Sequence, residues 1–338
     1  MLHHQQPFAC LKKRSSSFHS YTLSRTYNKL KNRLMNEIEF SILMGRVSTE
    51  DSARVLESLV ALRRQERSPT HEVVIVDRLQ DAVTDIIRRD HPEVVLLACA
   101  ANTTLPEMRR LALERASGLF IIVTEDHCVP SDDWLVSFQE VIKKAPVDAA
   151  AFGGCVENGV YDTALDWATF LCEYSNSMSP RPNGYATDIP GMNVAYRREA
   201  LSSIPTEQLD RGFWETTVHP ELERGNQRLY SSNDIKIYHC KKFSLGLFCR
   251  QRFVYSRYYA GIRFPIAARS RRITTALLSL ALPPVLFWRM TRSILEKKRL
   301  RREFVQASAY LALFSVIWAA GDIAGYIFGP GDALLEIE

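Results

Sequence analysis

The fold is decided by residues 120–130, which read FIIVTEDHCVP and join an apolar run to a cluster of polar side chains. Phe120–Thr124 is rich in β-branched residues, which favours a buried strand. Glu125, Asp126 and His127 follow this strand directly. Because ligands in open α/β sheets bind beyond the carboxyl ends of the strands, we expect these three side chains to lie at a binding site.

Three further apolar runs precede this stretch, and segments with helical spacing separate them. We predict strands over Ile38–Met44, Glu72–Asp77 and Val94–Ala98, and helices over Thr49–Arg64, Asp81–Arg89 and Glu107–Ala116. Strands that alternate with amphipathic helices indicate an α/β fold with a doubly wound, mostly parallel sheet. We expect Ser48 or Thr49 to cap the first of these helices, and Asp77 to share one crevice with the polar cluster.

Composition narrows the class of protein. The chain has 338 residues and a net charge of +5, and its basic residues gather in the first thirty positions and between Arg263 and Arg302. Positive charge beside apolar segments favours anionic lipids as partners, and no zinc-finger or aromatic-interleaved basic motif indicates nucleic-acid binding. The seven cysteines show no CxxC spacing, which is typical of reduced core thiols.

The chain divides into three predicted parts. We expect a disordered basic tail over residues 1–36, a catalytic domain over residues 37–262, and membrane-associated helices over residues 263–338. Two apolar segments, Ile273–Trp288 and Phe304–Phe328, flank a basic linker. With the catalytic domain in the cytoplasm, the positive-inside tendency predicts a shallow or re-entrant first segment and a second segment that crosses the membrane. The alternative is that both segments are buried helices of a soluble domain.

Three groups of residues could bind a ligand or take part in catalysis. Each group also has a purely structural explanation. Carboxylates and an imidazole at Glu125–His127 offer ligands for a divalent cation, but such a strand end also caps helices. Glu215 follows Trp214, and partial desolvation beside an aromatic would raise its pKa toward that of a general base. A loop tryptophan is more often packing, however. His239 ends a β-like run, where a lone histidine is usually structural.

These groups, in this order and with GMNVAYRREAL at residues 191–201, resemble the family 2 glycosyltransferases with the GT-A fold. The resemblance covers roughly Glu39–Gly261. It implies that Asp77 contacts the nucleotide base and that Arg109 or Arg110 approaches the nucleotide. It also implies that Glu125, Asp126 and His127 stand in place of an Asp-x-Asp metal motif, which His239 joins.

The same resemblance implies roles for the later motifs. Asn193 corresponds to a residue near the donor sugar and the acceptor. Glu215 occupies the place of the catalytic base, with Trp214 in place of the first residue of the usual acidic pair. Arg252 lies where the family often places diphosphate contacts. The first strand departs from the family pattern, because it ends in Met44-Gly45-Arg46.

The implied function is inverting, metal-assisted transfer of a sugar from a nucleotide-sugar donor, at the cytoplasmic face of a membrane. The metal would be Mn²⁺ or Mg²⁺, and a UDP-sugar is the default donor. We expect a lipid-linked or polysaccharide acceptor. Two alternatives stay open: a nucleotidyltransferase on a related sheet, although no Gly-rich, lysine-bearing phosphate loop is visible, and an inactive membrane-attached scaffold.

Overall fold

A computed structural model describes residues 40–65, 67–263 and 269–338. The predicted tail over residues 1–36 and the beginning of the first predicted strand lie outside the described residues. Residues 39–338 cluster as one compact unit, and the description below concerns this unit.

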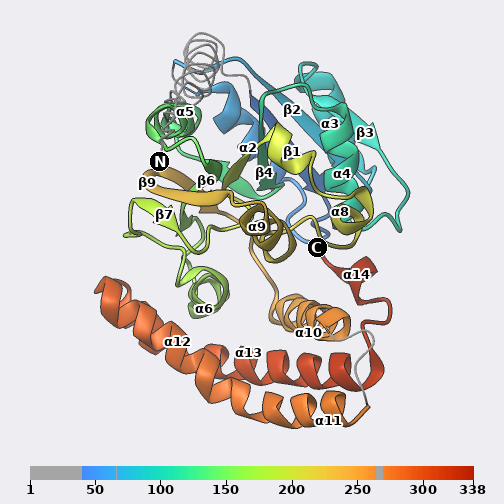
Figure 1. Cartoon of the computed structure of the whole chain (residues 1–338), viewed down its shortest axis with the longest axis vertical. Coiled ribbons are helices and arrows are strands. Elements are labelled where there is room, and N and C mark those ends of the chain that lie inside the picture. Colours follow the sequence, from blue (N-terminus) through green and yellow to red (C-terminus); the bar gives the residue numbers. More distant parts are fainter. Residues whose placement is uncertain (1–39, 66, 264–268) are drawn as a thin grey trace, which may run out of the picture. The chain divides into compact units, whose positions relative to one another are not determined.

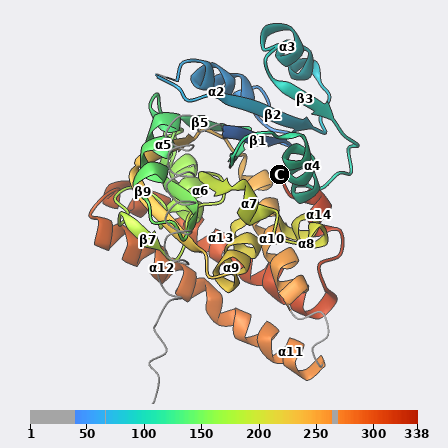
Figure 2. The same cartoon turned by 45° about the horizontal axis from the view of Figure 1, so that its top comes forward.

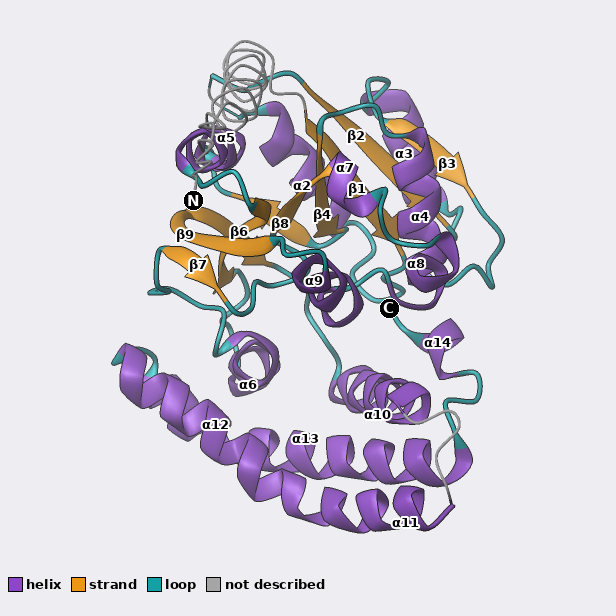
Figure 3. Cartoon of the chain, viewed as in Figure 1, coloured by secondary structure: helices purple, strands orange, loops and turns teal. Residues whose placement is uncertain are grey.

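The described residues form a nine-stranded mixed sheet with flanking helices (Figure 3). Its order is β3-β2-β1-β4-β8-β6-β9-β5, and β7 pairs with β9. The strands are β1 (Phe40–Arg46), β2 (His71–Asp77), β3 (Val95–Ala98), β4 (Phe120–Glu125), β5 (Cys128–Pro130), β6 (Ala149–Asn158), β7 (Gly184–Ala186), β8 (Val194–Arg197) and β9 (Arg228–His239).

The predicted parallel sheet is confirmed for β3-β2-β1-β4, whose neighbours all pair in parallel. Every residue of β1 is buried, as expected for a central parallel strand with both faces covered. Beyond β4 the sheet becomes mixed, because β8 runs antiparallel to both β4 and β6 while β6 and β9 pair in parallel.

Helices connect and cover these strands (Figure 1). In the first half of the chain they are α2 (Arg54–Arg63), α3 (Ala82–Asp90), α4 (Leu105–Arg115), α5 (Trp134–Lys144) and α6 (Ala164–Tyr174). In the second half they are α7 (Arg198–Leu201), α8 (Thr206–Gly212), α9 (Glu215–Arg224), α10 (Leu245–Arg263), α11 (Arg269–Leu278), the 3₁₀ turn η1 (Ser279–Ala281), α12 (Leu282–Lys297), α13 (Arg301–Phe328) and α14 (Ala333–Glu336).

Local capping explains where several helices begin. Thr104 and Glu107 form a capping box at the start of α4, so this helix begins two residues before its predicted start. Asp81, the first residue of the predicted second helix, instead caps α3, which begins at Ala82. The predicted cap of α2 is wrong: that helix begins only at Arg54 and has no side-chain cap. The Ser48 hydroxyl instead donates to Asp126 Oδ1 at 2.7 Å.

Four helices, α10, α11, α12 and α13, lie together as a layer on one side of the sheet (Figures 1 and 2). α12 continues to Lys297, so Arg289 and Arg292 are helical, and only residues 298–300 connect α12 to α13. The predicted basic linker is therefore wrong at its start, because Met290 and Ile294 extend the buried face of the helix.

α13 packs closely against α10 and α6 over much of its length. A Cβ added at Gly321 would lie 2.5 Å from the Phe253 carbonyl oxygen, so glycine permits this close approach of the two backbones. Ser256 on α10 donates a 2.6 Å hydrogen bond to the buried Asp322. α13 is thus attached to α10 by close backbone contact and by a buried polar pair.

Candidate active site

Strand pairing brings two histidines together at the end of β4. Cys128 on β5 pairs with His239 on β9, so His239 lies beside His127, which precedes Cys128. Their Nε2 atoms are 3.1 Å apart, and the rings meet edge to face. Glu125 Oε2 lies 3.2 Å from His127 Nε2. One ligand atom from each of Glu125, His127 and His239 thus falls within a common distance of 4.8 Å.

The charges of this triad depend on His127. Burial alone would lower the pKa of His127, but hydrogen bonds to Asp126 and Glu125 raise this pKa to about 9. Burial and the charge on His127 lower the pKa of His239 to about 3. Burial would raise the pKa of Glu125, but the hydrogen bond from His127 lowers it to about 2. One proton therefore sits between two imidazoles and a carboxylate, where a divalent cation could replace it.

Asp126 links His127 of the triad to the residues that follow β1. Its carboxylate accepts hydrogen bonds from the Val47 and Ser48 amides, at 3.0 and 3.2 Å, and lies 2.8 Å from His127 Nδ1. When His127 Nδ1 donates a hydrogen bond to Asp126, the other ring nitrogen, Nε2, faces Glu125 and His239. Asp126, predicted as a metal ligand, is directed here toward the end of β1 and toward His127, while the other three predicted ligands converge.

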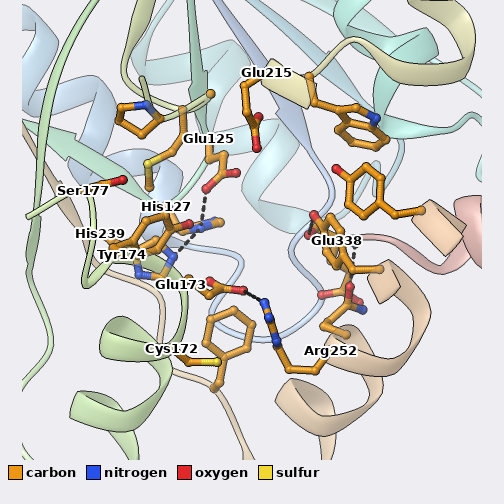
Figure 4. A pocket seen from close by; sticks show the side chains of 18 of the residues that line it. Glu125, His127, Cys172, Glu173, Tyr174, Ser177, Glu215, His239, Arg252 and Glu338 are labelled. Carbon is orange, nitrogen blue, oxygen red and sulfur yellow. Dashed lines mark hydrogen bonds and ion pairs between the residues drawn. The ribbon is translucent and has the colours of Figure 1, made fainter. Parts of the chain in front are cut away.

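Glu215 faces the same cavity as the triad. The cavity measures about 270 Å³, and Glu215 lines it together with Glu125, His127 and His239 (Figure 4). Burial raises the pKa of the Glu215 carboxyl, and the charge on Glu125 adds to this effect. A Cβ at Gly191 would collide with Glu215 Oε2. The glycine in the GMN motif therefore leaves room for this carboxylate.

Arg109 and Trp214 complete this side of the cavity. The buried guanidinium of Arg109 lies 5.8 Å from the centre of the Trp214 ring and donates a 2.9 Å hydrogen bond to the Phe213 carbonyl. Its Nη2 lies 3.9 Å from Glu125 Oε1. Arg109 is thus a positive charge close to the triad carboxylate.

Arg252 lies at the other end of the cavity (Figure 4). Its Nη1 is 3.3 Å from Glu173 Oε1, and its guanidinium lies 4.1 Å from the centre of the Trp318 ring. Its Nε is buried and has no hydrogen-bond partner. An arginine predicted as a diphosphate contact therefore does line the cavity.

Besides Asp126, three predicted site residues do not line this cavity. Asp77 forms a buried ion pair with Arg46 at 3.1 Å, Arg110 pairs with Asp210 and Glu114, and Asn193 accepts a 2.8 Å hydrogen bond from Trp134 Nε1. The amide of Asn193 also donates to the Cys155 carbonyl. Each of the three side chains thus has protein partners, and their predicted roles toward a nucleotide remain predictions.

The prediction missed several residues that line the cavity. They are Glu173 from α6, Tyr255 and Tyr259 from α10, Trp318 from α13, and Glu338. Tyr255 and Tyr259 are spaced four residues apart and belong to the aromatic series before Gly261, a signal that could have placed them on one helix face. Glu173 and Trp318 have no local pattern that distinguishes them.

The last described segment covers the carboxyl ends of β1 and β2. Glu338 Oε1 accepts a 2.7 Å hydrogen bond from Thr49, and Glu338 Oε2 lies 3.2 Å from Lys241 Nζ. Arg78, directly after β2, donates to the Ile337 carbonyl. This segment therefore forms one wall of the cavity in the described structure.

Comparison with protein families gives a match over residues 48–204 to glycosyl transferase family 2. This part of the chain is therefore similar to a family 2 glycosyltransferase domain. The matched range contains Glu125 and His127, whereas Glu215 and His239 follow it. The match favours the glycosyltransferase interpretation over a nucleotidyltransferase.

Solved glycosyltransferases resemble the chain over most of its length. The mannosyltransferase PcManGT from Pyrobaculum calidifontis, solved with GDP-mannose and Mn²⁺, is 16% identical, with 92% of this chain and 94% of that chain covered and a TM-score of 0.48. S. aureus TarS 1–349 is 14% identical, with 86% and 89% covered and a TM-score of 0.46. A search of curated protein sequences found no match.

Proposed function

We propose that the glycosyltransferase moves a sugar from a nucleoside-diphosphate donor to an acceptor hydroxyl with inversion at the anomeric carbon. The observation that carries this proposal is the shared cavity, in which a half-buried Glu215 faces the Glu125, His127 and His239 triad. A base with a raised pKa and a cation site are the two groups that such a displacement needs.

Glu215 acts as the general base in this mechanism. It accepts the proton of the acceptor hydroxyl as the oxygen bonds to the anomeric carbon, and the bond from that carbon to the diphosphate oxygen breaks. A divalent cation held by Glu125, His127 and His239 would neutralise charge on the departing diphosphate. Two imidazole nitrogens and one carboxylate oxygen suit Mn²⁺ better than Mg²⁺. Arg109 adds positive charge on the same side of the cavity.

The donor is the first part of this proposal to test. UDP and GDP, each with Mn²⁺, Mg²⁺ or chelator, are added to the purified protein in a thermal-shift experiment. A ligand present at 100 times its Kd stabilises the folded state by about 2.7 kcal/mol, so one nucleotide with metal should raise Tm by several degrees. UDP is the first candidate. No shift with any pair of nucleotide and metal would contradict the proposed donor site.

The C-terminal helices suggest how the enzyme meets a membrane. Two helical stretches, Ser270–Lys297 (α11, η1 and α12) and Arg301–Phe328 (α13), are long and apolar enough to cross a bilayer. However, α13 packs on α10 and α6, and α10 lines the active-site cavity. Crossing the bilayer would draw these helices into the hydrocarbon. We therefore infer that the layer lies in the plane of the membrane, with the catalytic domain on the cytoplasmic side.

The side of this layer away from the catalytic domain is apolar. A groove of about 570 Å³ between α12 and α13 is lined by Pro283, Pro284, Phe287, Trp288, Thr291, Ala312 and Val316. Trp288 is 62% exposed and Val316 is 55% exposed, although both are large and hydrophobic. Apolar helix faces of this kind bury themselves at the boundary between headgroups and acyl chains.

Cysteine labelling distinguishes an in-plane layer from a crossing helix. Lys298→Cys and Glu336→Cys lie beyond opposite ends of α13. In sealed vesicles, an impermeant maleimide should label both variants from the same side, after subtraction of the wild-type background. Labelling from opposite sides would show that α13 crosses the bilayer.

A further inference from the structure

A second cavity opens off the active-site cavity, between α6 and the helices α10, α12 and α13. Its volume is about 210 Å³. Both cavities are lined by Cys172, Glu173 and Arg252, so they meet at these side chains. We refer to this second space as the side cavity. Among the residues that line it, only Arg252 has a role predicted from the sequence, as a diphosphate contact.

The side cavity is amphiphilic. One part of its wall is apolar, from Leu286 and Met290 on α12 and from Phe314 on α13. Arg289 on α12 and Arg252 on α10 provide positive charge. Such a combination of cationic and apolar walls suits a molecule with an anionic head and an alkyl chain.

The two arginines have capacity for a ligand. Within the described part of the chain, no hydrogen bond or ion pair engages the exposed Arg289, and Arg252 Nε is buried without a partner. Guanidinium groups bind phosphate oxygens in pairs of parallel hydrogen bonds. Glu173 is the one carboxylate in this wall, and burial raises its pKa, which reduces its repulsion toward an anion.

The position of the side cavity relates it to both the membrane and the chemistry. α12 separates it from the apolar groove that we place against the bilayer, because Leu286, Arg289 and Met290 face the side cavity while Phe287, Trp288 and Thr291 face the groove. Figure 4 shows Glu173 and Arg252 at the end of the main cavity opposite to Glu215. A molecule that enters here from the membrane would extend toward the base.

We propose that the side cavity is the acceptor subsite and binds the phosphate of a lipid-linked acceptor. Arg289 and Arg252 contact the phosphate, and Leu286, Met290 and Phe314 contact the adjoining alkyl chain. This inference rests on the proposed function. Because Glu215 lies at the far end, the reacting group is a sugar hydroxyl carried by the lipid phosphate, and the phosphate itself is not the nucleophile.

Binding of a simple amphiphile tests the subsite directly. Dodecyl phosphate, below its micellar concentration, is titrated into the full chain in the presence of saturating UDP and Mn²⁺, which occupy the proposed donor site. Inorganic phosphate and dodecyl maltoside serve as the free-anion and neutral-amphiphile probes. We expect dodecyl phosphate to bind at least about tenfold more tightly than either probe, since only it combines both recognition elements.

Two variants on one helix localise the effect. Arg289→Gln should weaken dodecyl phosphate binding by about tenfold, the loss expected for a charged hydrogen bond. Arg292→Gln is the matched control, because Arg292 is also exposed on α12 but pairs with Glu296 at 2.7 Å and does not line the cavity. It should bind within twofold of wild type.

Each contrary outcome has a distinct meaning. Equal losses in Arg289→Gln and Arg292→Gln would indicate unspecific attraction to the basic helix and overturn the subsite. Wild-type affinity in Arg289→Gln, or equal binding of inorganic phosphate, would also overturn it. If UDP fails to bind while dodecyl phosphate still depends on Arg289, the proposed donor chemistry fails and the anionic-lipid site stands.

Discussion

Glu215→Gln should lower kcat for sugar transfer by about 10²–10⁴-fold, the usual contribution of a general base. Gln keeps the shape of the side chain but cannot accept the acceptor proton. Donor binding should stay within twofold of wild type, since the amide leaves the triad unchanged. Nucleotide affinity and single-turnover transfer are the two measurements. Transfer at the wild-type rate would remove Glu215 from its role.

The raised pKa of Glu215 gives this prediction a second readout. Burial is the main cause, and it favours the protonated form in the folded state. The stabilising effect is therefore complete below the unfolded pKa of about 4.3 and is lost as pH rises through the folded pKa. At neutral pH the charged carboxylate costs stability, so Glu215→Gln should raise Tm. In the wild type, kcat/KM should fall on the acid side with a midpoint above about 4.3, because the base must be deprotonated.

Two further substitutions control the interpretation of Glu215. Glu223→Gln lies on the same helix, is exposed and is outside the cavity, so it should change neither rate nor Tm. Gly191→Ala places a methyl group against the Glu215 carboxylate and should also reduce kcat. An unchanged rate in Gly191→Ala would mean that the position of this carboxylate is not critical.

Glu125→Gln should weaken Mn²⁺ binding by at least about 10²-fold. Loss of a residue that only hydrogen-bonds to a metal ligand already costs about 10–100-fold in metal affinity, and Glu125 is itself a proposed ligand. Glu125 is the one carboxylate among the three converging side chains, and an amide is a poorer ligand for a hard cation. Free Mn²⁺ measured by electron paramagnetic resonance reports the affinity. Transfer should fall in parallel, and added chelator should abolish it in the wild type.

Asp126→Asn separates binding of the metal from support of the fold. The Asp126 carboxylate is buried and accepts hydrogen bonds from Val47 and Ser48, and an unsatisfied buried partner costs about 1–3 kcal/mol. This variant should therefore unfold at lower denaturant concentration, whereas Glu125→Gln should not. Wild-type Mn²⁺ affinity in Glu125→Gln would contradict the role of Glu125 as a metal ligand. Equal destabilisation of both variants would contradict the separate role of Asp126 in supporting the fold.

Patterns within short stretches determined much of the fold. Apolar runs predicted β2 and β4 within about one residue, because their side chains are buried in a parallel sheet whatever the partners are. The helix predicted over Asp81–Arg89 begins one residue later, at Ala82. Glu125 and His127 were found as candidate ligands because they follow directly on one strand. These features depend on neighbours in the sequence, so the sequence alone was sufficient.

The composition of the site depended on contacts between distant residues. His239 joins His127 only because β5 pairs with β9, and Glu215 reaches the triad because α9 begins at the cavity. Asp126 and Asn193 look like ligands in the sequence, yet burial against β1 and against Trp134 gives each of them protein partners.

The sequence by itself determined the class of fold, the strand that ends at Glu125 just before His127, and the resemblance to family 2 glycosyltransferases. Only the tertiary structure decided which polar side chains share a cavity, and that Arg252 and Arg289 meet around a side cavity between α6, α10 and α12. The physical reason is that periodicity and capping act over a few residues. Convergence of ligands depends instead on strand register and helix packing, which join residues more than a hundred positions apart.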